Sequence, residues 1–199
     1  MKSRLILAGG AVLVGLAAVI IFAFAQPYVM HGSVIEPAQP APSISLPASD
    51  GTSYNLDQQK GKLVLLFFGY TNCTDVCPAT MAQLRQVLTA IGNQAKSVQV
   101  VFITVDPQRD TTDQLQRYLA AFGPNFVGLS GTVDQLDPVW KEYGVYHEIQ
   151  PAGATENYTV AHSALVYVID KKNQLRMTYP FGADGDSIRQ DLEHLLKEN

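Results

Sequence analysis

The amino-acid sequence contains a continuous apolar run at residues 62–70, KLVLLFFGY, that has the length of one β-strand. An unbroken run of this kind is typical of a central strand that is buried on both faces of a sheet. A second run lies at residues 98–105, and residues 78–94 carry apolar side chains at helical spacing, with Pro78 in the first turn. The sequence therefore predicts a strand, a helix and a second strand around one core.

The elements after these runs continue the alternation. Thr111 or Thr112 can cap a helix that continues to Phe122. The other predicted elements are a hairpin around Asp50-Gly51, strands at residues 126–129, 163–169 and 174–179, and helices at residues 133–143 and 187–197. This order predicts an α/β protein with a thioredoxin-like fold over residues 43–199.

The N-terminal segment has a different character. Residues 5–25 form a run of 21 apolar or uncharged residues, preceded by Lys2 and Arg4. This is about the length that crosses a hydrocarbon core as a helix, and the basic residues would stay in the cytoplasm. We expect residues 1–25 to be a single transmembrane anchor in a bacterial inner membrane, with the domain in the periplasm. A signal peptide cleaved after Ala25 is the alternative.

Residues 26–42 contain four prolines, which favours an extended spacer between the membrane and the domain.

The net negative charge of the chain lies outside its N-terminal segment. The first 25 residues contribute +2 to the net charge of −4, so the remainder carries −6. It has no cluster of Lys or Arg that could neutralise phosphates, which excludes nucleic acid as an expected partner.

Both cysteines lie in one stretch, GYTNCTDVCP at residues 69–78, between the first strand and the following helix. A helix N-terminus stabilises a thiolate, so Cys73 and Cys77 are candidates for metal binding or reversible oxidation. A static disulfide would close a loop of only three residues and would stabilise the chain poorly. Two thiols are also too few for a structural zinc site, whereas Cu(I) accepts few soft ligands and can add an imidazole.

Four histidines could supply that imidazole. His31 in the spacer and His194 in the last helix are most simply solvated, and His147 lies in a region that we interpret as a loop. His162 directly precedes an apolar strand, where a polar ring needs a partner. On the residues alone, a satisfied core histidine and a metal ligand both remain open for His162.

Three stretches together resemble the SCO/SenC family of copper chaperones. Residues 69–78 match its Cys-x-x-x-Cys-Pro motif, and VDPQRDT at residues 105–111 is similar to its VDPxRDT segment. YTVAHS at residues 158–163, followed by Tyr167 and Asp170, is similar to its histidine segment. The three motifs occur in the family's order and spacing.

The resemblance implies that Cys73, Cys77 and His162 bind copper, as Cu(I) and also as Cu(II) with an added oxygen donor. It implies a membrane-anchored metallochaperone that delivers copper to the copper-site subunit of cytochrome c oxidase, or keeps the cysteines of that site reduced. A periplasmic dithiol protein would first reduce the Cys pair.

The chain departs from the family at Asn72 and Thr74, where members often have His and Pro. Neither position is a ligand, but loss of the proline could change the stiffness of the loop and the reduction potential of the pair. The alternative function is a periplasmic thiol-disulfide oxidoreductase that uses Cys73 and Cys77, so enzyme status stays open. A peroxidase of the same fold is a third interpretation, but it needs a peroxide-binding Thr and Arg around one nucleophilic cysteine, and a single low-pKa thiol would then suffice.

Charged residues near these motifs have two interpretations. Asp106, Arg109 and Asp110 suit a turn that begins a helix, with Asp110 or Thr111 as the cap. Alternatively, one of these acids lies near the cysteine loop and orients a partner or tunes a thiol. Asp75, between the cysteines, would add negative charge that favours a bound cation.

Overall fold

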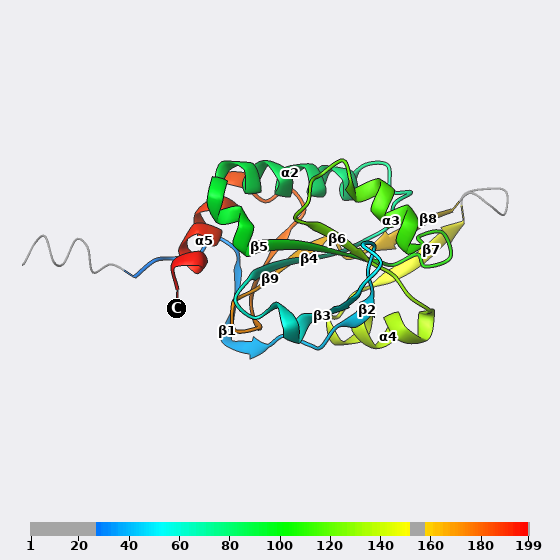
Figure 1. The fold of residues 1–199 in the computed structure, drawn as a ribbon, viewed down its shortest axis with the longest axis horizontal. Helices are drawn as coiled ribbons and strands as arrows, with labels where there is room; N and C mark the ends of the chain where they lie inside the picture. Colours follow the sequence, from blue (N-terminus) through cyan, green and yellow to red (C-terminus); the bar gives the residue numbers. More distant parts are fainter. Residues whose placement is uncertain (1–26, 152–157, 199) are drawn as a thin grey trace, which may run out of the picture.

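The apolar run at residues 62–70 forms β4 (Leu63–Gly69), a central strand of a six-stranded sheet. The structure is a computed structural model that describes residues 27–151 and 158–198. Strand β4 pairs in parallel with β5 (Val98–Thr104) and antiparallel with β9 (Leu165–Ile169). The first six residues of β4 are 0% exposed, because helices cover both faces of the sheet (Figure 1). The strand and its burial confirm the prediction.

The sheet has the strand order β1-β10-β9-β4-β5-β6. Its edge strands are β1 (Ser33–Pro40) and β6 (Phe126–Leu129), and β10 (Gln174–Pro180) lies between β1 and β9. Two separate hairpins consist of β2 (Ser45–Pro47) with β3 (Ser53–Asn55), and β7 (His147–Pro151) with β8 (Tyr158–His162). The helices are α2 (Val76–Ala90), α3 (Thr112–Leu119), α4 (Val133–Glu142) and α5 (Gly185–Lys197), with short 3-10 turns η1 (Leu56–Gln59) and η2 (Gly92–Ser97).

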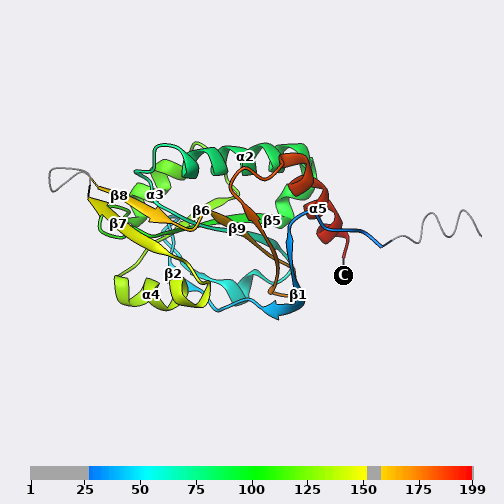
Figure 2. The same ribbon diagram turned by 180° about the vertical axis from the view of Figure 1, so that it is seen from behind.

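The helices form two layers around the sheet, as the α/β prediction requires. Helices α2 and α5 pack against each other on one face, and α4 lies on the other (Figures 1 and 2). The β7–β8 hairpin and α5 lie at opposite ends of the molecule in both views. Thr111 caps α3 by accepting a hydrogen bond from the backbone N–H of Gln114, which confirms its predicted role.

The proline-rich segment is extended, but much of it belongs to the sheet. Strand β1 lies within residues 26–42 and pairs antiparallel with β10, from Ser33 opposite Thr178 to Pro40 opposite Gln174. Proline has no backbone N–H to donate and is therefore tolerated in an edge strand such as this one. Residues 33–40 are therefore part of the sheet and do not form a free spacer. The packed part of the chain begins before residue 43, where the sequence predicts the start of the domain.

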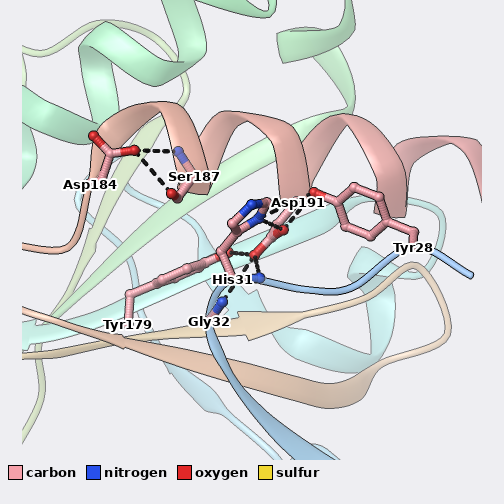
Figure 3. Close-up of polar contacts among 7 residues, drawn as sticks. All are labelled: Tyr28, His31, Gly32, Tyr179, Asp184, Ser187 and Asp191. Carbon is pink, nitrogen blue, oxygen red and sulfur yellow. Dashed lines mark hydrogen bonds and ion pairs between the residues drawn. The ribbon is translucent and has the colours of Figure 1, made fainter.

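Helix α5 also holds the chain just before β1 (Figure 3). The carboxylate of Asp191 is fully buried and accepts hydrogen bonds from Tyr28 Oη at 2.7 Å, His31 Nδ1 at 2.7 Å and the backbone N–H of His31 at 2.9 Å. The Gly32 N–H at 3.1 Å and the Tyr179 hydroxyl donate to it as well. Residues 28–32 are thereby fixed to α5 by one acid.

Two further predictions concern a membrane span and the surroundings of two histidines. Within residues 27–151 and 158–198, no helix is both long and apolar enough to cross a bilayer. The expected anchor at residues 1–25 lies outside the described residues. His31 and His194 are not simply solvated: His31 bonds Asp191, and the ring of His194 stacks on Tyr28 at 4.1 Å between centroids.

Candidate metal centre

The cysteine loop begins where β4 ends and closes at the start of α2. Cys77 is the second residue of α2 and is 0% exposed, whereas Cys73 precedes the helix and is partly exposed. The backbone N–H of Cys77 donates to Cys73 Sγ at 3.3 Å, and Asp75, the residue at the N-cap, makes no side-chain cap. A free N–H in the first helical turn therefore has a thiol sulfur as its acceptor.

This geometry separates the acidities of the two thiols. Hydrogen bonding from the Cys77 thiol and from the Cys77 backbone outweighs the effect of burial and lowers the pKa of Cys73 to about 3. The same thiol contact, together with burial, raises the pKa of Cys77. The pair therefore favours a thiolate on the partly exposed Cys73 and a proton on the buried Cys77.

His162, the last residue of β8, meets the cysteines from the opposite side of the site. Its Nδ1 lies 3.0 Å from the backbone carbonyl oxygen of Ser163, and its Nε2 lies 3.5 Å from Cys77 Sγ. A carbonyl oxygen can only accept, so in the neutral ring Nδ1 carries the hydrogen and Nε2 presents its lone pair to the thiol. Outer hydrogen bonds of this kind orient metal-binding histidines.

The rings of Phe67 and Tyr70 contact the imidazole edge-on and limit its rotation. Their centroids lie 6.0 and 5.8 Å from that of His162. Gly69 also matters here, because a Cβ at that position would lie 2.7 Å from the Phe67 ring and 3.0 Å from Cys77 Sγ. Gly69 thus allows the close approach of β4 to the thiol.

Cys73, Cys77 and His162 offer three ligand atoms that all lie within 4.8 Å of one another. In the described part of the chain, no other His, Cys, Asp or Glu side chains form a group of three that could hold a metal ion. Two soft sulfurs and one imidazole nitrogen fit Cu(I), which takes few ligands and prefers soft ones. The structure brings together all three residues for which the sequence predicts a metal-binding role.

The other candidates have different positions. His147 begins β7, where a loop is expected from the sequence, and it is directly paired with His162 across the hairpin. Its ring lies 4.3 Å from that of Trp140, and its buried Nδ1 has no hydrogen-bond partner among the described residues. Asp106, Arg109 and Asp110 follow β5 and contribute no atom to the group of three.

One group that orients His162 could not be predicted from the sequence. The backbone carbonyl of Ser163 fixes His162, and the backbone N–H of Ser163 donates to the carbonyl of Tyr146 at 3.0 Å. A backbone carbonyl carries no side-chain signature. Only the Ser that follows His162 in the family-like motif marks this place.

Known proteins are similar in sequence to this chain over most of its length. The SCO1/SenC family model matches residues 35–197. The SCO2-like protein of Rickettsia felis is 31% identical over 151 residues, which is 75% of this chain and 72% of that protein. The matches to two further Rickettsia SCO2-like proteins cover 60% and 62% of their lengths.

Solved structures agree with the fold. The copper-bound ScoI of Bradyrhizobium japonicum is 34% identical, with a TM-score of 0.73 over 78% of this chain and 99% of that one. The apo Sco1 protein of Thermus thermophilus is 31% identical, with a TM-score of 0.76 over 86% of this chain and 100% of that one. These matches confirm the thioredoxin-like α/β class. The chain belongs to the SCO1/SenC family.

Proposed function

We propose that this protein is a copper metallochaperone that holds one copper ion between Cys73, Cys77 and His162. The observation that carries the proposal is the convergence of these three side chains, from two distant parts of the sequence, within 4.8 Å. The similarity to copper-bound ScoI supports copper over other soft metals.

Each ligand has a distinct task in this function. The buried Cys77 and the oriented His162 would hold the ion from the inside, because packing and the Ser163 carbonyl fix their positions. The partly exposed Cys73 is the thiol that a second protein can reach. Cu(I) would leave by ligand exchange with thiolates of the acceptor, driven by tighter binding there. Cu(II) would use the same three ligands with an added oxygen donor.

We further propose the dinuclear copper site of cytochrome c oxidase as the acceptor, as the resemblance of the three motifs implies. Residues 1–25 would anchor the chain in a bacterial inner membrane and leave the domain in the periplasm. The charge-free run after Lys2 and Arg4 supports this placement. Because the periplasm is oxidising, a dithiol protein would have to reduce the Cys pair before copper binds.

A second candidate function is thiol-disulfide exchange with the acceptor's cysteines. The asymmetry of the pair favours it, since Cys73 is partly exposed and has a lowered pKa, whereas Cys77 is buried. The Cys73 thiolate would attack a disulfide of the acceptor and form a mixed disulfide. Cys77 would then displace the acceptor's sulfur, so that this chain is oxidised by two electrons and the acceptor is reduced.

An anaerobic titration of the reduced full-length protein with Cu(I) against a competing chelator tests the main proposal. We expect one ion per chain, and we expect Cys73→Ser, Cys77→Ser and His162→Ala each to weaken binding by more than about 100-fold, the upper range for loss of an outer-shell contact. His194→Ala serves as a histidine control and should bind as the parent does. Weak copper binding that is indifferent to His162→Ala, with rapid disulfide exchange, would favour the second candidate.

A further inference from the structure

The turn between β5 and α3 contacts both segments that carry the ligands. The buried carboxylate of Asp110 accepts hydrogen bonds from the Thr71 backbone N–H at 3.0 Å and from Thr71 Oγ1 at 2.6 Å. Thr104 Oγ1 donates to the same carboxylate at 2.8 Å. Thr71 lies two residues before Cys73, so Asp110 fixes the start of the cysteine loop.

The preceding residue, Arg109, contacts the histidine strand instead. Its Nη1 donates to the backbone carbonyl of Tyr158 at 3.0 Å, and its guanidinium carbon lies 3.5 Å from the centroid of the Tyr158 ring. Asp106 completes the contact, because it pairs with Arg109 and accepts the Tyr158 hydroxyl at 2.6 Å. Tyr158 is the first residue of β8, and His162 is the last.

A second contact connects Arg109 with the imidazole. The guanidinium carbon also lies 5.8 Å from the ring centroid of Tyr70, which in turn contacts the ring of His162 edge-on. Arg109 thus lies between two tyrosines, one at the start of the histidine strand and one beside the imidazole. A planar cation suits this position, because it can stack on a ring and donate hydrogen bonds at the same time.

These contacts are not needed to begin helix α3. Thr111 already provides the N-cap, so the carboxylates of Asp106 and Asp110 are not used as caps. Both acids are buried and bonded to groups outside their own turn, at Tyr158 and Thr71 respectively. The helix-start interpretation of the sequence therefore explains Thr111 and leaves these two acids and Arg109 unexplained.

We propose that Arg109 and Asp110 are positioning residues of the metal site. Arg109 acts on His162 through Tyr158 and Tyr70, and Asp110 acts on Cys73 through Thr71. Because the two residues are adjacent, one turn sets the distance between the imidazole and the thiols. The inference rests on the proposed copper site, whose ligands must be held in a fixed geometry by the groups behind them.

Double-mutant cycles of Cu(I) affinity on the full-length protein test the imidazole arm. Arg109→Met should weaken binding about 10–100-fold, in the range found for lost outer-shell partners of metal ligands. In a His162→Ala background the same substitution should add no further loss, because its target is gone. Arg109→Lys keeps the charge beside Asp106 but cannot stack and donate together, so an intermediate loss is expected.

The thiol arm has its own variant, which avoids removing a buried acid. Thr71→Val deletes the hydroxyl donor to Asp110 and leaves the backbone donor. Its weakening of Cu(I) binding should persist in the His162→Ala background, because it acts on the thiols. Arg189→Met is the control for loss of an arginine, since Arg189 pairs with Asp186 and Glu193 in α5, and it should leave affinity unchanged.

A readout without metal separates this inference from the proposed function. In the metal-free protein, the ring ¹H–¹⁵N NMR signals of His162 should shift or broaden in Arg109→Met and stay fixed in Arg189→Met. Unchanged His162 signals, or an equal loss of affinity with and without His162, would overturn the positioning role. If the parent protein shows no His162-dependent copper affinity, the proposed function fails, whereas the NMR result still decides the positioning of the ring.

Discussion

Two buried carboxylates hold two loops of this protein, and they differ in how completely they are satisfied. Asp191 accepts five hydrogen bonds and fixes residues 28–32 to α5, whereas Asp110 accepts bonds from Thr71 and Thr104 near the cysteine loop. Both side chains belong to residues that are 0% exposed. A carboxylate with this many donors has little capacity for a ligand, so the Asp191 cluster is structural.

The two thiols and the imidazole of the candidate metal centre are arranged differently from the Asp191 cluster. Cys73 Sγ, Cys77 Sγ and His162 Nε2 lie within 4.8 Å of one another, and Cys77 Sγ lies 3.5 Å from His162 Nε2. Ligand atoms this close together can exchange their mutual contacts for a metal. The comparison shows that a histidine beside an acid, such as His31, marks structure when the acid's oxygens are fully used.

The largest expected effect on stability comes from removing the structural acid. Asp191→Ala leaves the buried hydroxyl of Tyr179 without its acceptor, and it releases Tyr28 and His31, which solvent can reach. We expect a loss of about 1–3 kcal/mol in the free energy of unfolding, the cost of leaving a buried hydrogen-bond donor unpaired. Urea denaturation measures it, and Cu(I) affinity of the folded variant should stay that of the parent. A large change in copper affinity would show that the two regions are coupled.

The reverse pattern is expected for the imidazole. His162→Ala should lower Cu(I) affinity by more than about 100-fold, or nearly 3 kcal/mol. Its free energy of unfolding should change by only about 1 kcal/mol, because the ring is partly exposed and loses one bond to a backbone carbonyl. Denaturation and chelator competition on the same preparation check both values. Destabilisation as large as that of Asp191→Ala would contradict the separation of the two regions.

The two carboxylates should also respond to pH with opposite sign. Burial acts to raise the pKa of Asp191, but hydrogen bonds from Tyr179, His31 and Tyr28 prevail and lower it. Its contribution to stability is present above the pKa of the unfolded state, near 3.9, and is lost as pH falls through the folded pKa. Burial raises the pKa of Asp110, so its contribution is greatest below the unfolded pKa and is lost as pH rises through the folded pKa.

Denaturation curves between pH 2 and pH 7 compare the two acids directly. Relative to the parent, Asp191→Asn should lose part of the acid dependence below about pH 4. A milder variant, Thr71→Val, weakens the bonding of Asp110 without removing it, and should leave that acid dependence in place. An unchanged acid profile for Asp191→Asn would contradict the assignment of the lowered pKa to this cluster.

Within the metal site, the two cysteines should differ in reactivity. In the reduced, metal-free protein we expect iodoacetamide to modify Cys73 at least about tenfold faster than Cys77, because thiolate character and access both favour Cys73. Peptide mass spectrometry after timed quenching gives both rates. Equal rates would mean that the loop opens and that burial of Cys77 does not protect it.

The smallest expected effect concerns one donor of the structural cluster. Tyr28→Phe removes a single hydrogen bond to Asp191 and keeps the ring stacked on His194. A loss of about 1 kcal/mol in the free energy of unfolding is expected, with no change in copper affinity. Thermal unfolding detects it. A loss similar to that of Asp191→Ala would show that Tyr28 carries most of the attachment.

The sequence predicts features that depend on local pattern. The unbroken apolar run gives β4, the hydroxyl before a helical pattern gives the Thr111 cap, and the Asp50-Gly51 pair gives the β2–β3 hairpin. The candidate ligands Cys73, Cys77 and His162 follow from the resemblance of three motifs to the SCO/SenC family, since the residues alone leave the role of His162 open. These signals lie within a few residues of the feature that they predict.

Features that depend on distant partners do not follow from the sequence. Strand β1 is rich in proline and gains its place only by pairing with β10, some 140 residues later. His31 differs from a solvated histidine only through Asp191, and Arg109 differs from a helix-start residue only through Tyr158. No local pattern records these long-range contacts.

X-ray absorption at the copper edge of the Cu(I)-loaded, full-length protein distinguishes a copper site of two thiols and one imidazole from a site of thiols alone. We expect two sulfur ligands and one nitrogen ligand per copper, with the nitrogen contribution lost in His162→Ala and retained in His147→Ala. A spectrum with sulfur ligands alone in the parent, or a nitrogen contribution that survives His162→Ala, would contradict a site made of Cys73, Cys77 and His162.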